Sequence, residues 1–370
     1  MQAIILVGGE GLRLRPLTCN IPKPMVPVVN KPFLEHMFDN LKKHNINEII
    51  LAICYLPDHI KRHFGDGGDF GITLTYAVEK SPLGTGGAVK NAEGLLDDTF
   101  VVFNGDIFTD LDLTSMIAYH KEKKAKATIA LTPVEDPTAY GVVELNPQSK
   151  VKCFIEKPSW ERVTTNLINA GTYVLEPEVL DLIPSDTYCM LERGLFPDMV
   201  EQGVPFYGYP SNAYWIDIGN PADYLKLHHD ILMGKAMARF PGKSMADDIW
   251  TESGCNIHPA AKIIGPLVIG RDCTIEKGVR ISGPCVIGDK CIVRHGATID
   301  EAILWQNVKL GKDTTIRNSV IGNNSVIGDS TWITDSSIVS DDSRIGSGNK
   351  LEHGIRIWPG SIIEDNAISF

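Results

Sequence analysis

The chain has 370 residues, of which 43% are hydrophobic and 22% are charged, values typical of a globular protein long enough for two domains. Its formal net charge of −11 argues against an extended basic surface for nucleic acid. An anionic ligand would have to be met by individually placed lysines and arginines.

The N-terminal residues do not combine a basic segment with an apolar one of signal-peptide length, and no stretch approaches the ~20 apolar residues that span a bilayer. The eight cysteines include no C-x-x-C pair, so free thiols are expected, as in a reducing compartment. These features predict a cytoplasmic protein without a membrane partner.

In the first half of the chain, apolar runs alternate with a helical pattern. Residues 3–7 and 48–53 are continuous apolar runs, typical of strands buried on both faces of a parallel sheet. Between them, apolar side chains recur at helical spacing from Phe33 to Leu41. Further strands are expected at 72–78, 99–104, 126–132 and 151–155. This order predicts an α/β fold whose ligand binds beyond the carboxyl ends of strands, where the glycine-rich loop after the first strand stands.

The second half has a six-residue period. With one slip near Trp305, aliphatic residues recur at Ile257, Ile263, Ile269, Ile275, Ile281, Ile287, Val293 and Ile299, and again at Ile321, Ile327, Ile333, Val339, Ile345, Leu351, Ile357 and Ile363. This period matches the hexapeptide repeat of a parallel β-helix, and the pattern resembles the left-handed β-helix family. We interpret Cys273, Cys285 and Cys291, which stand at small-residue positions of the repeat, as packing residues rather than metal ligands. The expected domains are 1–235 and 255–370, joined by a linker at 236–254.

The loop after the first strand reads "GGEGLRLRP" and is followed by "PKP" at 22–24. It fits neither the dinucleotide fingerprint nor a P-loop. What remains is a backbone turn at Gly8, Gly9 and Gly11 whose N–H groups are able to cradle phosphate, with Arg13 placed for a bidentate phosphate contact. Lys23 stands between two prolines, which restrict the backbone and reduce the entropy lost in aiming its ammonium group.

These residues resemble the signature of the sugar-1-phosphate nucleotidyltransferases, also called sugar-nucleotide pyrophosphorylases. The resemblance covers about residues 1–235, its nearest likeness is to the mannose-1-phosphate guanylyltransferases, and the hexapeptide half matches an extension found in several members. The matching motifs follow in family order: "LVGGEGLRLRPLT" (6–18), "PKPMVPVVNKP" (22–32), "PLGTGGAV" (82–89), "VFNGD" (102–106), "YGVVE" (140–144), "FIEKP" (154–158), "NAGTYV" (169–174) and "YWIDIGNPADYL" (214–225).

The resemblance implies a Rossmann-like domain with a mixed, mostly parallel sheet, and a reaction in which a sugar-1-phosphate oxygen attacks the α-phosphorus of a nucleoside triphosphate. A phosphate monoester has a second pKa of about 6, so no general base is required near neutral pH. The chemistry needs in-line positioning of two anions and neutralisation of charge.

The resemblance also implies a role for each matching residue. Arg13 and Lys23 would grip the triphosphate, and Asp106 and Asp217 would bind Mg²⁺. The glycine loop with Gly8, Gly9 and Gly11 would hold the nucleotide together with Gly84 and Thr85 near the base, and the sugar phosphate would lie at Gly141, Glu156, Lys157, Asn169 and Gly171.

Each of these residues also has a structural interpretation. Taken alone, Asp106 is better explained as a turn or cap residue, and Asp217 also fits the N-cap of a helix beginning near Pro221. Glu156 and Lys157 fit an exposed strand end, and "LGTGG" at residues 83–87 fits the entry of a helix. His228 and His229 lack a second ligand pair and are interpreted as surface or packing residues.

GTP and mannose-1-phosphate are the favoured substrates, with dTTP or UTP and glucose-1-phosphate second. The family also implies non-catalytic, sugar-nucleotide-sensing relatives, but these tend to lose the arginine, lysine or aspartates retained here. An acetyltransferase activity of the β-helix would need a histidine base, and His258, His295 and His353 are present without a long inserted loop. The exposed edges and ends of a solenoid predict a homo-oligomer formed through the β-helix.

Overall fold

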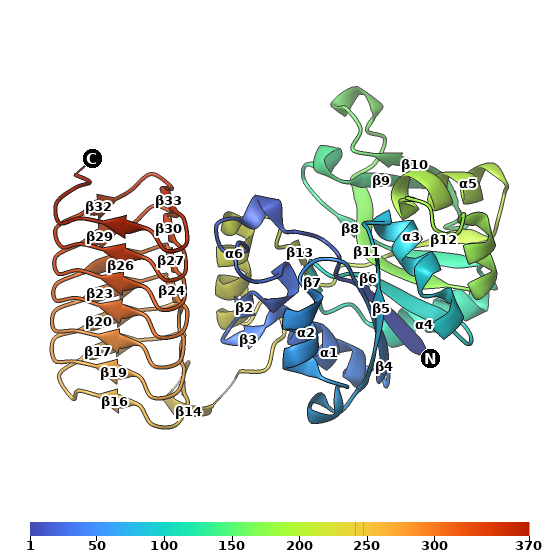
Figure 1. Ribbon diagram of the computed structural model, residues 1–370. Coiled ribbons are helices and arrows are strands. Elements are labelled where there is room, and N and C mark those ends of the chain that lie inside the picture. Colours follow the sequence, from blue (N-terminus) through green and yellow to red (C-terminus); the bar gives the residue numbers. More distant parts are fainter. Residues whose placement is uncertain (241, 247, 370) are drawn as a thin grey trace. The chain divides into compact units, whose positions relative to one another are not determined.

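Figure 1 shows the computed structural model, which describes residues 1–240, 242–246 and 248–369. Residues 241 and 247 of the predicted linker and residue 370 of the predicted β-helix lie outside the described residues. The chain forms two compact units. The sheet unit comprises Met1–Glu10 and Leu34–Asp217, and the coil unit comprises Gly11–Phe33 and Ile218–Phe370. The segment 11–33, which the predicted domain boundaries place with the first domain, is thus grouped with the coils.

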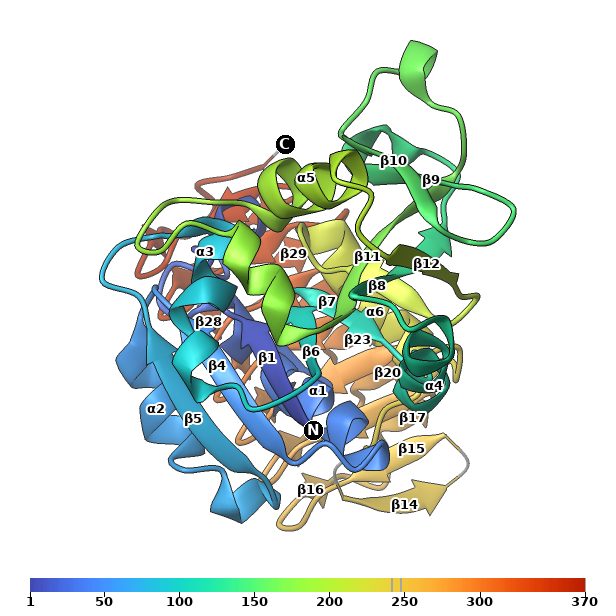
Figure 2. The same ribbon diagram turned by 90° about the vertical axis from the view of Figure 1, so that its right-hand side faces the viewer.

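A mixed sheet of nine strands forms the sheet unit. Its order is β10-β9-β11-β6-β1-β4-β5, and β8 pairs with both β11 and β12. The parallel neighbours β6, β1, β4 and β5 lie side by side in Figure 2, whereas β11 runs antiparallel to β6. The strands are β1 (Gln2–Leu6), β4 (Glu48–Ile53), β5 (Thr73–Val78), β6 (Phe100–Asn104), β8 (Ala127–Pro133), β9 (Gly141–Leu145), β10 (Val151–Glu156), β11 (Leu167–Leu175) and β12 (Phe206–Pro210).

The predicted α/β sheet is confirmed, and all six expected strands are present. Continuous apolar runs form central strands because both of their faces are covered; Ala3, Ile4 and Ile5 of β1 are all fully buried. The helices of this unit are α1 (Phe33–Lys43), α2 (Pro57–Phe64), α3 (Gly84–Asn91), α4 (Leu113–Lys123) and α5 (Phe196–Glu201). A separate antiparallel pair, β7 (Ile107–Thr109) and β13 (Trp215–Asp217), lies outside the main sheet.

The coil unit contains a parallel β-helix with three stacked sheets, seen as regular coils in Figure 1. We call the first of them, from β14 to β33, the platform sheet; it holds β14 (Lys243–Ala246), β15 (Ile249–Thr251), β18 (Leu267–Ile269), β21 (Cys285–Ile287), β24 (Ile303–Leu304), β27 (Val320–Ile321), β30 (Ile338–Val339) and β33 (Arg356–Ile357). The second sheet holds β16 (Asn256–Ile257), β19 (Thr274–Ile275), β22 (Ile292–Val293), β25 (Lys309–Leu310), β28 (Val326–Ile327), β31 (Arg344–Ile345) and β34 (Ile362–Ile363). The third holds β17 (Lys262–Ile264), β20 (Arg280–Ser282), β23 (Thr298–Asp300), β26 (Thr315–Arg317), β29 (Trp332–Ile333) and β32 (Lys350–Leu351).

The six-residue period marks the interior of the coils. The periodic aliphatic residues line the core, together with Cys273, Cys285 and Cys291, whose thiols bond to backbone carbonyls inside the coils. These cysteines therefore pack as predicted. The slip near Trp305 consists of shorter coils: Ile269 pairs with Ile287 eighteen residues on, but Ile287 pairs with Leu304 and Leu304 with Ile321. Part of the predicted linker joins the solenoid, because β15 pairs in parallel with β18.

The other elements of the coil unit are the helix α6 (Pro221–Leu232) and a two-stranded hairpin, β2 (Pro27–Val28) with β3 (Lys31–Pro32). The helix starts where the sequence predicts, but its N-cap is Asn220, whose side chain accepts a hydrogen bond from Asp223 N at 3.0 Å. None of the helices in the described part of the chain is long and apolar enough to cross a membrane.

Candidate functional site

The turn after β1 packs against the loop that leads into α3. A Cβ atom at Gly8 would lie 3.2 Å from Glu79 Oε1, whereas one at Gly9 would meet nothing within 4 Å. Glu79 is 7% exposed and accepts a hydrogen bond from Leu83 N at 2.8 Å, and burial raises the pKa of its carboxyl. Two segments with matching nucleotide motifs are therefore neighbours in the fold, and the buried carboxylate of Glu79 connects them.

Gly84 and Thr85 begin α3, as the helix-entry interpretation also foresaw. Gly84 has a φ of +72°, and a Cβ atom there would lie 2.6 Å from the carbonyl oxygen of Cys189. The same oxygen accepts hydrogen bonds from Gly86 N at 2.9 Å and Gly87 N at 3.0 Å. The glycines thus allow two backbone segments to meet directly, and Cys189 belongs to a segment that no sequence motif assigns.

The Thr85 hydroxyl forms hydrogen bonds within the protein. It donates to Glu192 Oε2 at 2.7 Å and accepts from Leu191 N at 2.9 Å. Glu192 is 7% exposed, and after burial its charge is the strongest influence raising the pKa of the Glu156 carboxyl. Sequence reasoning missed Glu192 because its partner is 107 residues away and the surrounding "LERG" has no motif spacing. It connects the expected nucleobase loop with the expected sugar-phosphate residue.

Glu156 and Lys157 end the edge strand β10. Glu156 lies opposite Gly141 of β9, and a Cβ atom at Gly141 would lie 2.9 Å from Glu156 Oε2. The glycine therefore leaves the room that the carboxylate occupies. The Lys157 side chain is 61% exposed, with its Nζ 3.9 Å from Glu156 Oε1. An exposed ammonium beside a half-buried carboxylate is able to meet an anion from solvent.

Asn169 and Gly171 form an irregularity in β11. The Asn169 side chain donates to the Tyr173 hydroxyl at 2.9 Å and accepts from Gly171 N at 2.9 Å. The pairing register of β11 with β8 shifts between Asn169 and Tyr173, and Trp215 Nε1 of β13 donates to the Ala170 carbonyl at 2.9 Å. Asn169 therefore shapes this bulge with its own amide, which leaves one N–H and spare acceptor capacity for a ligand.

Asp106 and Asp217 come together through the β7–β13 ladder. Asp106 lies in the turn between β6 and β7, and Asp217 ends β13 directly opposite Ile107, the residue after Asp106. Asp217 is not the N-cap of α6. Asn104 Oδ1, two residues before Asp106, is a buried oxygen without a hydrogen-bond partner among the described residues. This turn thus gathers carboxylate and amide oxygens, the donors that a hard divalent cation prefers.

No group of three or more His, Cys, Asp or Glu residues suited to a metal occurs in the described ranges. Two carboxylates suit a hard divalent cation that fills its other positions with water and substrate phosphates. A self-sufficient protein cage, such as a structural zinc site, is not what these two aspartates form.

Arg13 and Lys23 belong to the coil unit. Arg13 lies in a single 3₁₀ turn, Leu12–Leu14, preceded by Gly11 with a φ of +65°. A Cβ atom at Gly219 would lie 2.6 Å from an Arg13 guanidinium nitrogen, so this guanidinium lies against the turn before α6. Lys23 begins a second 3₁₀ turn, Lys23–Met25, and is 7% exposed.

Both cations act on Asp223 in the first turn of α6. Burial raises the pKa of the Asp223 carboxyl, while the Asn220 amide and the charges of Lys226, Arg13 and Lys23 oppose that shift. The two cations of the signature segment therefore share one electrostatic neighbourhood, next to the positive end of a helix dipole. Asp223 is not among the residues expected from the sequence, although "NPAD" carries a capping pattern that places it near the helix start.

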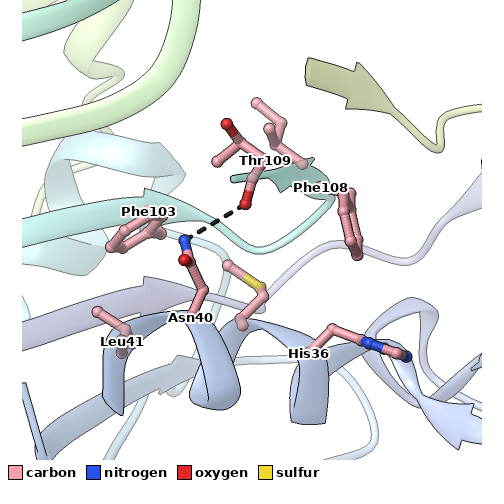
Figure 3. A pocket seen from close by; sticks show the side chains of 8 residues that line it. His36, Asn40, Leu41, Phe103, Phe108 and Thr109 are labelled. Carbon is pink, nitrogen blue, oxygen red and sulfur yellow. Dashed lines mark hydrogen bonds between the residues drawn. The ribbon is translucent and has the colours of Figure 1, made fainter. Parts of the chain in front are cut away.

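A shallow hollow lies between α1 and the β6–β7 turn (Figure 3). It is lined by His36, Met37, Asn40, Leu41, Phe103, Ile107, Phe108 and Thr109. Asn40 Nδ2 donates to the Thr109 carbonyl at 3.3 Å, and the His36 and Phe108 rings lie 5.9 Å apart. None of the expected site residues lines it. Its walls fix β7, the strand that follows Asp106.

The chain matches the nucleotidyl transferase family over residues 2–234. It belongs to this family. Residues 246–351 match the LbH domain of EIF2B subunit epsilon, which identifies the coils as a left-handed β-helix. The chain is therefore a nucleotidyltransferase, and a nucleoside triphosphate and a sugar-1-phosphate are the substrates of this enzyme type. Family members generally use a divalent metal ion.

Several characterised relatives and solved structures are similar. A mannose-1-phosphate guanylyltransferase of Mycobacterium tuberculosis is 38% identical over 73% of this chain and 75% of its own length. A UTP–glucose-1-phosphate uridylyltransferase of a Synechocystis species is 35% identical over 87% of both chains. The crystal structure of HddC from Yersinia pseudotuberculosis complexed with GMP-PN has a TM-score of 0.54 and 32% identity, and the match covers 61% of this chain and 97% of HddC.

Proposed function

We propose that this enzyme transfers a guanylyl group from GTP to mannose-1-phosphate, giving GDP-mannose and pyrophosphate. The likeness to mannose-1-phosphate guanylyltransferases from bacteria, fungi and amphibians supports this choice, as does the guanine nucleotide in the related HddC structure. The geometric observation that carries the proposal is the β7–β13 ladder, which sets Asp217 opposite the residue after Asp106. This pairing supports a two-carboxylate site for the metal of a triphosphate.

In the proposed reaction an oxygen of the sugar-1-phosphate attacks the α-phosphorus of GTP. The bond from the α-phosphorus to its bridging oxygen breaks, and pyrophosphate leaves with the bonding electrons. The attacking oxygen is deprotonated near neutral pH, so no side chain has to accept a proton. We assign Arg13 and Lys23 to the triphosphate, where their charges stabilise the negative charge that develops on the leaving group.

The remaining residues position the two substrates. Gly8, Gly9 and Gly11 allow close backbone approach to the nucleotide, and Gly84 and Thr85 lie at its base. Lys157 meets the phosphate of the sugar, and Glu156 accepts hydrogen bonds from sugar hydroxyls, with Gly141, Asn169 and Gly171 shaping the pocket around them. The exposure of Lys157 and the partial burial of Glu156 support this division of roles.

Asp106 and Asp217 are the proposed ligands of Mg²⁺. When bound, the ion would neutralise charge on the phosphate oxygens during transfer. The two aspartates orient it by their fixed positions at the end of β13 and in the turn before β7.

Glucose-1-phosphate with UTP or dTTP is the second candidate, because the Synechocystis relative matches 87% of the chain. Purified protein should be assayed with GTP, UTP, dTTP and ATP against mannose-, glucose- and N-acetylglucosamine-1-phosphate, with released pyrophosphate as the readout. We expect the highest kcat/KM for GTP with mannose-1-phosphate. A higher value for UTP or dTTP with glucose-1-phosphate would replace the proposal, and no pyrophosphate from any pair would favour a sugar-nucleotide sensor.

Two further properties belong to this proposal. We place the enzyme in the cytoplasm, supported by eight cysteines that are all free thiols. We also propose a homo-oligomer formed through the β-helix, supported by exposed apolar side chains on the coils, including Ile264 at 66%, Trp358 at 54% and Ile362 at 69% exposure. Sedimentation equilibrium tests the second point, because a monomer at micromolar concentration would contradict it.

A further inference from the structure

The outward face of the platform sheet is buried, although it points away from the coil interior. Successive side chains of a strand point to opposite faces, so Val286, between the core residues Cys285 and Ile287, points outward. It is only 1% exposed, and the equivalent residues of four other coils are equally buried: Val268, Ile303, Val320 and Ile338. By contrast, outward residues of the other two sheets are open to solvent, for example Trp332 at 48% exposure. Something in the coil unit covers this face.

Polar contacts identify the cover as segment 11–33 and α6. Ser340 Oγ donates to the Pro16 carbonyl at 2.9 Å, and Arg356 Nη1 donates to the Arg15 carbonyl at 3.1 Å. Trp305 Nε1 donates to the Tyr224 hydroxyl of α6 at 3.0 Å. That hydroxyl in turn donates to the carbonyl of Pro27. These contacts occur along the segment that carries Arg13 and Lys23.

The contacts come from positions where the repeat departs from its own rule. The residue directly after the inward aliphatic residue of a platform strand is glycine in three coils: Gly270, Gly288 and Gly322. In the last platform coil the same position holds Trp358, which is 54% exposed. In two other coils it holds Trp305, which is 2% exposed, or Ser340, which is 1% exposed. The coil itself requires neither Trp305 nor Ser340 at this position, because other coils have glycine there. Ser340 instead bonds segment 11–33 directly, and Trp305 bonds Tyr224 of α6, whose hydroxyl bonds the same segment.

Segment 11–33 requires stabilising contacts, because the turn of its β2–β3 hairpin is strained. Val29 has a φ of +47° and Asn30 a φ of +63°, as in a type I′ turn, for which Asn and Gly are the favoured residues. A β-branched valine at positive φ persists only where its surroundings impose it. Here Val29 is fully buried, and its N–H donates to His228 Nδ1 of α6 at 3.5 Å.

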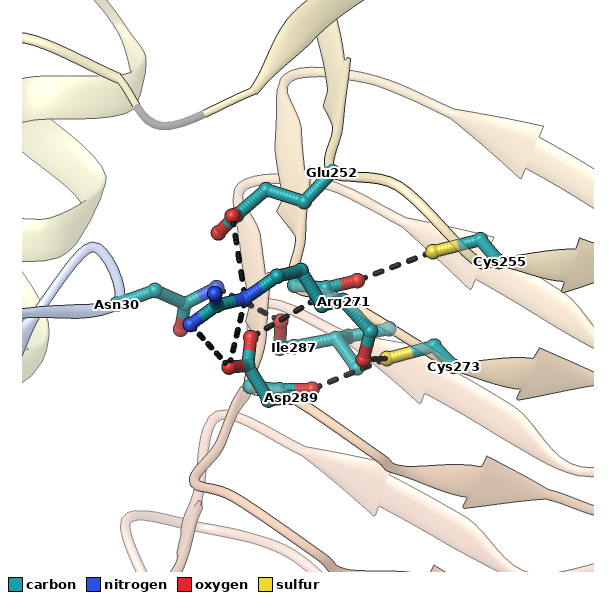
Figure 4. A network of polar contacts seen from close by, with 9 residues as sticks. Asn30, Glu252, Cys255, Arg271, Cys273, Ile287 and Asp289 are labelled. Carbon is teal, nitrogen blue, oxygen red and sulfur yellow. Dashed lines mark hydrogen bonds and ion pairs between the residues drawn. The ribbon is translucent and has the colours of Figure 1, made fainter.

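The tip of the hairpin is fixed to the coils as well. Asn30 Nδ2 donates to the Ile287 carbonyl at 2.8 Å, and Figure 4 shows Asn30 beside the neighbouring coils that carry Arg271 and Asp289. Burial raises the pKa of the neighbouring Glu252 carboxyl, and the charge of Lys31 acts against that shift. Backbone and side-chain contacts thus hold both ends of the strained turn.

We propose that Ser340 and Trp305 of the β-helix are positioning residues for nucleotidyl transfer, which hold segment 11–33 in the conformation that presents Arg13 and Lys23 to the triphosphate. The inference rests on the proposed function of these two cations. It gives the β-helix a direct part in binding the nucleotide, in addition to any role in assembly.

Ser340→Gly is the decisive variant, because glycine already occupies the equivalent corner of three coils and the coil itself should fold unchanged. Ser343→Ala is the matched control: Ser343 is also a buried serine, but its hydroxyl bonds the Trp358 carbonyl inside the coils at 3.1 Å. We expect Ser340→Gly to raise KM for the nucleoside triphosphate about ten-fold, equivalent to about 1.4 kcal/mol, with KM for the sugar-1-phosphate unchanged. Ser343→Ala should lower the melting temperature and leave both KM values unchanged.

Tyr224→Phe provides a second variant, since it removes the hydroxyl between Trp305 and Pro27, and the same selective rise in KM is expected. Hydrogen exchange of segment 11–33 should become faster in both variants. Wild-type KM values in both variants would overturn the proposal, as would equal rises in both KM values or the same nucleotide effect in Ser343→Ala. A wild-type enzyme that releases no pyrophosphate would refute the proposed function instead, and hydrogen exchange would still test the positioning.

Discussion

Gly171 offers a direct test of how tightly the turn around Asp106 is packed. Its φ is +69°, and a Cβ atom there would lie 2.3 Å from Ile107 Cδ1 and 2.9 Å from Asn104 Nδ2. Alanine at this φ costs about 1 kcal/mol, and overpacking a full site adds about 1–3 kcal/mol. Gly171→Ala should therefore lower the free energy of unfolding by about 2–4 kcal/mol. Because Asn104 and Ile107 flank Asp106, we also expect kcat to fall by ten-fold or more.

Gly203→Ala separates the two contributions. Gly203 has nearly the same φ, +71°, but a Cβ atom there would meet nothing within 4 Å. This control should lose only about 1 kcal/mol and keep full activity. Urea unfolding and steady-state kinetics of both variants provide the comparison. The reasoning is refuted if Gly171→Ala is no less stable than Gly203→Ala and turns over at the wild-type rate.

Four other substitutions test the same structure. Lys23→Ala and Asp106→Ala should each remove most turnover while the circular-dichroism melting curve stays close to wild type, and full activity in either would contradict the assigned roles. Burial raises the pKa of Asp341 from 3.8 to about 6, so the folded protein binds more protons than the unfolded chain between these values, and the stabilisation present at low pH is lost as the pH rises through 6. Asp341→Asn should remove a penalty of up to about 3 kcal/mol at pH 7.5 and little at pH 4, which melting temperatures at both pH values would show; parallel pH profiles would count against it. Glu192→Gln should lower the pKa of Glu156 by removing a neighbouring negative charge, and an acidic limb of the kcat/KM profile that fails to shift toward lower pH would argue against this electrostatic interaction.

The parts of the fold that repeat locally could be predicted from the sequence. Continuous apolar runs gave the central strands, and the six-residue period gave the coil interior, because burial on a regular element leaves a regular pattern. Around Trp305 the sequence shows only that the period slips. Each shorter coil lacks one residue, and the sequence does not show which corner of the coil has lost it. The strands β7 and β13 have three residues each, too few for a periodic signal, so only the structure pairs Asp217 with Ile107.

The parts of the site that depend on distant contacts could not be predicted. Thr85 meets Glu192 across 107 residues, and Pro16 meets Ser340 across 324. A sequence motif marks residues that a ligand requires, whereas the groups that hold those residues in place vary with the rest of the chain. Glu192 and Ser340 accordingly carry no recognisable spacing.

Residues that depart from a strong sequence repeat nevertheless indicate where distant parts of the chain make contact. In a solenoid the coil dictates the inward residues and the tight corners, so a buried side chain at a corner where other coils have glycine points to another constraint. Trp305 and Ser340 are two such corners: Ser340 bonds segment 11–33 directly, and Trp305 bonds Tyr224 of α6, which bonds the same segment. The outward aliphatic residues at Val268, Val286, Ile303, Val320 and Ile338 add a second signal, because a solvent-facing column would not need to be apolar in five successive coils. Together these two departures define which face of the solenoid is covered, and they follow from the sequence once the coil register is known.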